Sequence, residues 1–254
     1  MVELKILGEK RIFILSLVPV LVYLNSIKGE FVHDDIPAIV KNPDVTGSSG
    51  FINLLQSDYW GDNLQDSRSH KSFRPLTTAT FRLTATIFGL SPVWYHVINI
   101  LLHSFVSSFL YFILIKRIQL NKETSSLISL LFSLHPIHTE AVSGIVGRAD
   151  LLTCLFMLVS FYLSTSHPNT VKKELGSHLC VVLGLMSKEI GLTVLIINIL
   201  FILLTRTDRV DWRRFVSSIC LLVLLTTARI AYNKTQPSFI DQDNPASHDK
   251  NFLT

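Results

Sequence analysis

Charged side chains are scarce in this 254-residue chain, and that scarcity limits what the chain can be. Charged residues make up 17% of it, against about a quarter of a typical soluble domain. Apolar residues make up 48%, and the mean hydropathy is +0.42. A soluble domain needs a charged surface, so the composition predicts an all-α membrane protein with several spans. The net charge is only +4 and no basic stripe is present, which excludes a nucleic-acid binder.

Cysteine is equally rare. Cys154, Cys180 and Cys220 all lie in apolar runs, where they are expected to pack as small hydrophobic side chains, not to form a disulfide framework or a zinc site. His135 and His138 stand three residues apart, but no third metal ligand accompanies them, and such a pair is a weak indication of a metal site. We therefore expect neither a metal nor a cofactor.

Seven apolar runs predict seven membrane-spanning helices. A helix needs about 20 residues to cross the hydrocarbon core, with a lower limit near 17, and the shorter runs fit a thin bilayer such as that of the endoplasmic reticulum. Basic residues precede the first run, but no small-residue cleavage site follows it, so we expect an uncleaved signal-anchor. The runs are 12–27, 93–115, 124–139, 151–166, 175–187, 190–205 and 215–231.

Basic residues predict the orientation, because they favour the cytoplasmic side. With seven spans every basic cluster falls on one side, and the N-terminus is cytoplasmic. Residues 175–205 could instead form one broken span, but the last cluster would then be luminal. We therefore prefer two short spans that meet at Ser187, Lys188 and Glu189. The clusters are Lys5, Lys10 and Arg11; Lys116, Arg117 and Lys122; Lys172 and Lys173; and Arg206, Arg209, Arg213 and Arg214.

The longest predicted luminal segment is the loop 28–92. Apolar residues spaced by three and four predict a helix over 73–88, and an amphipathic helix at the membrane surface is predicted from Phe51. A polar tail, 232–254, is expected to follow the last span into the lumen. The predicted organisation is a helical membrane domain over 1–231 and a short luminal tail.

Two adjacent carboxylates stand just past the first predicted span. Asp35 precedes a typical helix start and could cap that helix. The alternative is a carboxylate base at the membrane surface. Adjacent side chains of an extended chain point apart, so Asp34 and Asp35 are expected to differ: one could cap while the other acts. His33 would support them.

Three cations are predicted on the same side of the membrane as this pair, namely Arg74, Arg148 and Lys188. Charges near the membrane are costly and indicate function by default. Cations beside a carboxylate suit a lipid-linked phosphate donor, because they would stabilise the negative charge of its leaving group. The residues expected to support this site are His135, His138, Glu140, Asp150 and Glu189.

Short motifs follow one another along the chain: Phe31–Asp35, Lys41–Val45, Phe73–Thr77, His135–Val142, Gly147–Leu152, Ser187–Glu189 and Asp241–Ser247. Each alone is weak, but the ordered set, from about residue 12 to about residue 247, resembles the transmembrane and tetratricopeptide-repeat-containing protein O-mannosyltransferases. The resemblance implies a GT-C-type membrane fold. It also implies transfer of mannose from dolichyl-phosphate mannose to Ser or Thr hydroxyls of cadherin-type domains in the lumen of the endoplasmic reticulum.

The same resemblance identifies Asp34 and Asp35 with the paired acidic motif of that family. It favours catalysis over capping for this pair, with one aspartate as the base of a single inverting displacement. The phosphate is already a good leaving group, so no second carboxylic acid is required.

The chain departs from that family in one respect. It contains no helical repeat of about 34 residues, so we expect a fragment or a short isoform, and a catalytically inactive membrane protein is one alternative. A small-solute transporter is another, since His96, Asn99 and His103 form a polar stripe in the second run. The simpler interpretation of the stripe is hydrogen bonding between helices.

Overall fold

The computed structural model describes residues 2–67, 69–168, 170–205 and 211–233. Apart from turns and one isolated bridge between Ser57 and Asn63, the regular structure in these residues is helical, so the predicted all-α class is confirmed. The longer helices are α1 (Val2–Val22), α3 (Pro75–Phe88), α4 (Pro92–Lys116), α5 (Lys122–Leu134), α7 (Arg148–Ser164), α8 (Val171–Ser187), α9 (Val194–Thr205) and α10 (Trp212–Asn233). The shorter ones are η1 (Leu24–Lys28), η2 (Ile36–Val40), α2 (Pro43–Thr46), η3 (Phe51–Leu55), α6 (His138–Ser143), η4 (Ile145–Gly147) and η5 (Glu189–Thr193).

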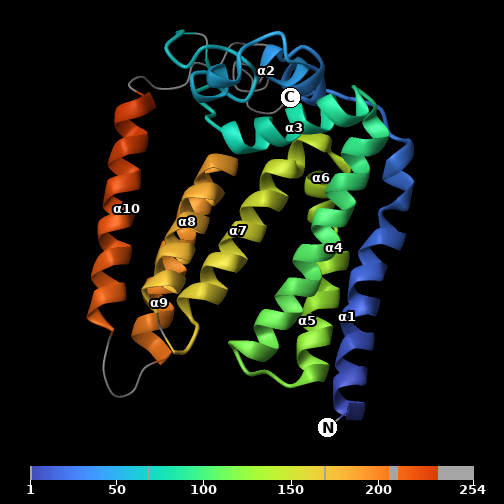
Figure 1. The fold of residues 1–254 in the computed structure, drawn as a ribbon. Helices are drawn as coiled ribbons and strands as arrows, with labels where there is room; N and C mark the ends of the chain where they lie inside the picture. The colour runs from blue at the N-terminus through green and yellow to red at the C-terminus, as the bar shows by residue number, and fades with distance from the viewer. Residues whose placement is uncertain (1, 68, 169, 206–210, 234–254) are drawn as a thin grey trace, which may run out of the picture.

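Each predicted apolar run corresponds to one helix of a single bundle. Helices α1, α4, α5, α7, α8, α9 and α10 run side by side between an upper and a lower end (Figure 1). The segment 28–91, which includes α2 and α3, lies across the upper end, and the N-terminus lies at the lower end. The long loop therefore covers one end of the bundle.

Three helical segments among the described residues are long and apolar enough to cross a membrane. They are Pro92–Lys116, Ile145–Ser164 and Trp212–Tyr232, and Glu189–Leu204 is a shorter apolar helix. The chain is thus a membrane protein. The count of seven spans and the GT-C architecture stay predictions.

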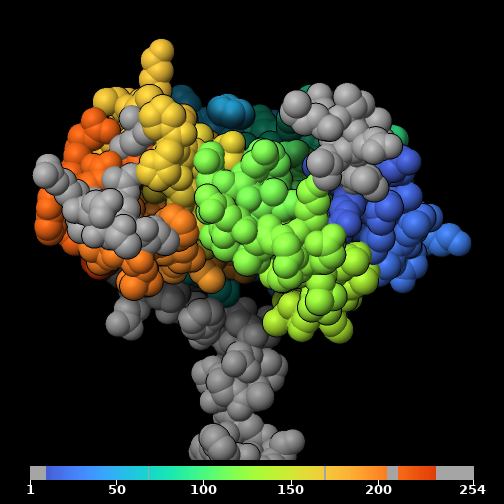
Figure 2. Space-filling model, turned by 90° about the horizontal axis from the view of Figure 1, so that it is seen from below, coloured from blue at the N-terminus to red at the C-terminus, as the bar shows by residue number. Residues whose placement is uncertain are grey.

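The basic clusters that the structure describes gather at the lower end. The α4–α5 turn and the α7–α8 connection lie there side by side (Figure 2), and the Arg117 guanidinium donates a 2.6 Å hydrogen bond to the Ser166 hydroxyl between them. The buried Arg214 donates to the carbonyls of Ser164 and Ser166. Arg206, Arg209 and the tail beyond residue 233 lie outside the described residues. The grouping matches the predicted alternation of ends, while the side of the membrane that each end faces stays a prediction.

Residues 175–205 form two helices, as predicted. Lys188 has an extended backbone (φ −159°, ψ 147°), which ends α8 before η5 begins. Gly191 of η5 packs directly on α8: a Cβ atom at Gly191 would lie 2.4 Å from the carbonyl carbon of Gly184. This close approach lets α9 turn back beside α8, and it leaves Lys188 at the upper end of the bundle.

The loop 28–91 packs around a small core that includes Ile39, Tyr59 and Phe81 of the loop and Tyr95 of α4. The predicted helix over 73–88 is confirmed as α3. The segment from Phe51 is a short 3-10 helix, with the side chains of Phe51 and Ile52 exposed.

The polar stripe on α4 bonds to neighbouring segments. The Asn99 amide donates to the carbonyl oxygens of Gly144 and Ile145, both at 3.2 Å. His103 Nε2 lies 3.0 Å from the carbonyl oxygen of Ser133. For Asn99 and His103, the interpretation as bonding between helices is confirmed.

Candidate functional site

Asp34 and Asp35 have different environments at the upper end of the bundle. Asp35 is 2% exposed, and its two carboxylate oxygens accept hydrogen bonds from the backbone N–H groups of Val32 (3.1 Å) and Val146 (3.0 Å). Its side chain makes no capping bond to η2, which contradicts the capping alternative for Asp35: the carboxylate ties the loop to η4 instead. Asp34 is exposed at the rim.

Burial changes the acidity of Asp35. The pKa of its carboxyl is raised above the ordinary 3.8, chiefly because burial removes water from the charged form. The two backbone N–H donors and the charge of His96 lower the pKa, and the charge of Asp34 raises it, but burial dominates. The Asp35 carboxyl is therefore buried and bonded to the backbone, whereas the Asp34 carboxyl is accessible to solvent.

Arg148 is fully buried, at 0% exposure. Its guanidinium donates to the Asn99 amide oxygen (3.0 Å), the Thr84 hydroxyl (3.0 Å) and the carbonyls of Thr80 (3.3 Å) and Tyr95 (3.2 Å). These partners belong to α3 and α4, so Arg148 at the start of α7 holds three helices together. A phosphate could reach it only if they separated, which does not fit the role predicted for it.

Lys188 and Glu189 make two separate ion pairs. The Lys188 ammonium lies 2.7 and 2.8 Å from the two oxygens of Asp150, and its side chain is 31% exposed. Glu189 pairs with Arg74 (3.5 Å) and with Arg229 of α10 (2.6 Å). The turn between α8 and α9 is thus fixed to α7, to the start of α3 and to α10.

Tyr59 lies among these charged groups. It is 1% exposed, its hydroxyl donates to the carbonyl oxygen of Val146 (2.8 Å), and the Arg74 guanidinium stacks 4.8 Å from its ring centre. Burial raises the pKa of Tyr59, while the charges of Arg74 and Arg148 lower it and those of Asp35 and Asp150 raise it. Five groups from distant parts of the chain therefore meet in one region.

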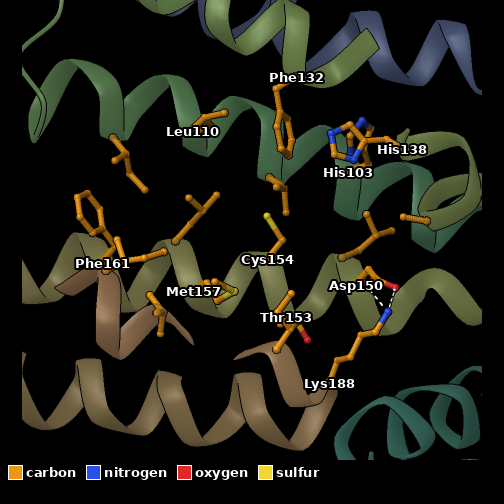
Figure 3. A pocket seen from close by; sticks show the side chains of 18 of the residues that line it. His103, Leu110, Phe132, His138, Asp150, Thr153, Cys154, Met157, Phe161 and Lys188 are labelled. Carbon is orange, nitrogen blue, oxygen red and sulfur yellow. Dashed lines mark hydrogen bonds and ion pairs between the residues drawn. The ribbon is translucent and has the colours of Figure 1, made fainter. Parts of the chain in front are cut away.

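A cavity of about 680 Å³ runs down the bundle from this region. His138, Glu140, Asp150 and Lys188 line its charged end, and apolar side chains line the rest (Figure 3). The walls come from α4, α5, α6, α7, η5 and α9. The apolar lining includes Val106, Leu110, Leu114, Phe132, Met157, Leu158, Phe161, Val194 and Ile197.

The remaining predicted residues are spread around this end. His138 lies against Phe132 and His103, with ring centres 4.4 and 5.2 Å apart. His135 is exposed, and its Nδ1 accepts a hydrogen bond from the Ile137 N–H. His33 is exposed at a turn with φ 42°. Among the described residues, no group of three His, Cys, Asp or Glu could hold a metal ion.

Two residues of this region were missed by sequence reasoning. Arg229 was overlooked although a cation inside the last apolar run is itself an indication of function. It donates to Glu189 and to the carbonyls of Lys71 and Phe73. The part played by Tyr59 has no sequence indication, because it depends on contacts with distant residues such as Val146, which is 87 positions away.

The chain is similar to several proteins that are all named protein O-mannosyl-transferases. The chain is 37% identical to the human (Homo sapiens) protein O-mannosyl-transferase TMTC2 over 91% of its own length and 30% of that protein. It is 36% identical to the Caenorhabditis elegans protein O-mannosyl-transferase F38B6.6 over 94% of its length and 34% of that protein. It is 38% identical to the human protein O-mannosyl-transferase TMTC1 over 75% of its own length and 23% of that protein. No family model and no solved structure matches. The chain spans about a quarter to a third of the length of these relatives.

Proposed function

Since the chain belongs to the family of transmembrane protein O-mannosyl-transferases, of whose members it matches one part, we propose that it transfers mannose from dolichyl-phosphate mannose to Ser or Thr hydroxyls of luminal proteins, including cadherin-type domains. One observation carries the proposal: an apolar cavity ends in charged side chains at the same end of the bundle as Asp34. A lipid carrying a phosphate has this same division between an apolar tail and a charged head.

Lys188 is the group that we assign to the donor phosphate. It lines the cavity at the charged end and is partly exposed. An ammonium carries three donor hydrogens, and Asp150 accepts from it with two oxygens, so a donor remains for a phosphate oxygen. Arg74 is engaged with Glu189 and Tyr59, and Arg148 is enclosed, so neither replaces Lys188 without a rearrangement.

Asp34 is the base that we assign to the acceptor. In the proposed step the acceptor hydroxyl oxygen attacks C1 of the mannose from the face opposite the phosphate. The bond from C1 to the phosphate oxygen breaks as the new bond forms, and the hydroxyl proton passes to the Asp34 carboxylate. Dolichyl phosphate leaves as an anion, whose charge Lys188 offsets. Asp35 holds the loop and takes no part in the transfer.

The orientation follows from the charges at the other end. Basic clusters favour the cytoplasm, so we assign the lower end and the N-terminus to the cytoplasm. The upper end, with Asp34 and Lys188, then faces the lumen of the endoplasmic reticulum, where the acceptor proteins would be exposed to the site.

The test is reconstitution of the chain in vesicles with labelled dolichyl-phosphate mannose and a cadherin-domain acceptor. Asp34→Asn should lower the transfer rate at least about 100-fold, the range typical of a lost general base. The matched control is Glu30→Gln, an exposed acid of the same loop, which should keep the wild-type rate. Lys188→Met should weaken binding of the donor. Unchanged transfer by Asp34→Asn would contradict the assignment of Asp34 as the base.

The two alternative functions give different results in the same vesicles. An inactive member of the family would bind the labelled donor without transferring mannose, in the wild type and in every variant. A transporter would move a solute across the vesicle membrane without sugar transfer.

A further inference from the structure

The turn that carries Asp34 is closed by hydrogen bonds at both of its ends. The Asp35 N–H donates to the Val32 carbonyl oxygen (2.9 Å), and the Asp35 carboxylate accepts from the Val32 N–H (3.1 Å). The carbonyl oxygens of His33 and Asp34 accept from two N–H groups of η2, at 3.2 and 3.1 Å. The backbone of the turn is therefore held in one conformation.

His33 has the unusual backbone angle of this turn. Its φ is 42°, and it is the one residue of the turn Val32–Asp35 with a positive φ. A positive φ at the second position alone is the pattern of a type II′ turn, in which glycine usually stands there. Other residues with a positive φ are uncommon. Histidine and asparagine tolerate it better than most, whereas a β-branched residue with a positive φ is an outlier.

The His33 imidazole, in contrast to the backbone of the same residue, makes no specific contact. The side chain is exposed. No hydrogen bond, ion pair or ring contact joins it to another residue in the part of the chain that the structure describes. The contacts of His33 are thus made by its main chain.

This turn sends two adjacent carboxylates in different directions. Asp35 is 2% exposed and is anchored by the Val146 N–H at 3.0 Å, while Asp34 is exposed at the rim. Because Asp35 is anchored, a change of φ at His33 would move the Asp34 side chain relative to this anchor. The conformation of residue 33 therefore determines where the Asp34 carboxylate points.

From these contacts we propose that His33 is a positioning residue for mannose transfer: its left-handed backbone, and not its imidazole, holds the Asp34 carboxylate outward at the rim. This inference rests on the proposed function, which assigns Asp34 as the base. The side chain at position 33 then matters only through the backbone conformations that it allows.

The first test compares variants of position 33 in the reconstituted vesicles. His33→Gly and His33→Asn allow a positive φ. Each should keep kcat within about threefold of the wild type and keep its pH–rate profile, since a lost general acid or base costs at least about 100-fold. His33→Val disfavours a positive φ and should lower kcat at least about tenfold, with the KM for the donor nearly unchanged, because a small misplacement is costly. His33→Ala should lie between glycine and valine, and it serves if His33→Val does not fold.

The matched control for a loss of stability is Gln119→Val. Gln119 also has a positive φ, 61°, and it is exposed in the α4–α5 turn at the other end of the bundle. Valine there meets the same backbone restriction, but kcat per folded protein should stay at the wild-type value. An equal loss of kcat in Gln119→Val and His33→Val would contradict a positioning role for His33.

A second readout does not depend on the transferase reaction. The three native cysteines are replaced by serine, and Asp34→Cys is labelled in detergent with a water-soluble maleimide. Position 34 should react readily in this chain, and adding His33→Gly should preserve the labelling. Adding His33→Val should remove most of it. Equal labelling of the two double variants would overturn the inference.

The results separate the role of His33 from the proposed function. A larger loss of kcat or a changed pH–rate profile in both His33→Gly and His33→Asn would assign the role to the imidazole and overturn the inference, while mannose transfer by the wild type would keep the proposed function. No transfer by the wild-type chain would refute the proposed function, and with it the positioning of a base. The labelling would still report whether residue 33 controls the turn.

Discussion

The loop 28–91 and the helical layer beneath it are built in opposite ways. In the loop, charged groups are buried and satisfied: Asp58, 2% exposed, accepts from the Ser69 hydroxyl and from backbone N–H groups, and the Lys71 ammonium donates to the carbonyls of Leu64 and Asp66. In the helical layer most buried polar groups are small, with Arg148, Arg214 and His103 as the larger exceptions, and many large apolar side chains face outward. Examples of the first are Ser125, Ser129, Ser133, Ser160 and Asn198, and of the second Leu127, Leu131, Leu204, Leu224 and Ile230.

We attribute this difference to the surroundings of the two regions, which are water for the loop and lipid for the helices. A loop in water gains free energy by enclosing apolar side chains, whereas helices in lipid gain none from that and associate through close packing and small polar groups. The candidate site lies where the two regions join. Substitutions in both regions can therefore test this difference.

The largest expected effect is at Arg148, which joins the regions. Arg148→Met would remove the Arg148 donor from the Asn99 amide oxygen, from the Thr84 hydroxyl and from the carbonyls of Thr80 and Tyr95. Each lost donor costs about 1–3 kcal/mol, so the variant should lose at least about 3 kcal/mol of stability. The fraction of folded protein in detergent and its thermal unfolding measure this.

The control for this substitution is Lys172→Met, which removes an exposed cation at the other end of the bundle. Its stability should change by no more than about 0.5 kcal/mol, as is usual for a surface position. Wild-type stability in Arg148→Met would show that the loop and the helices do not depend on this buried network.

Replacing an exposed apolar side chain with aspartate should have a larger effect in lipid than in water. Leu224 of α10 is 62% exposed and Ile52 of the loop 70%, so exposure alone treats them alike. An aspartate near the centre of a membrane helix costs about 2.5–3.5 kcal/mol, so Leu224→Asp should strongly reduce the share of protein that resists alkaline extraction from membranes. Ile52→Asp should change that share little, and equal losses would show that the loop segment also lies in lipid.

Sequence patterns predicted the helices well, since hydrophobic runs depend on nearby residues. Each of the seven runs corresponds to a helix, and the break at Lys188 was predicted from the alternation of the basic clusters. Asp35 was harder, because its partner Val146 is 111 residues away and only local capping could be judged. Arg148 and Lys188 were equivalent in sequence, but burial among three helices distinguishes Arg148. The cavity arises from packing alone, so no run or spacing predicted it.

Close packing of backbones is expected to matter more between the helices than in the loop. A Cβ atom at Gly191 would meet the backbone of Gly184 at 2.4 Å, whereas one at Gly50 would have its nearest neighbour at 4.0 Å. Gly191→Ala should therefore lower stability by about 1–3 kcal/mol, the usual effect of overpacking. Gly50→Ala should leave thermal unfolding in detergent nearly unchanged, and equal effects would contradict the tight junction of α8 and η5.

The smallest expected effect is a dependence of stability on pH, caused by Asp35 at the junction of the two regions. The pKa of Asp35 is raised in the folded protein above the ordinary 3.8, mainly by burial, so the folded state binds this proton more tightly than the unfolded state. The stability that the group contributes is full below the unfolded pKa and is lost as the pH rises through the raised folded pKa.

Asp35→Asn removes the titration but keeps one acceptor oxygen. The difference in melting temperature between the wild type and this variant should therefore shrink as the pH rises from about 4 towards 7. Asp34→Asn should keep the wild-type slope, because the buried carboxyl remains. A wild-type slope in Asp35→Asn would mean that a group other than Asp35 causes the dependence on pH.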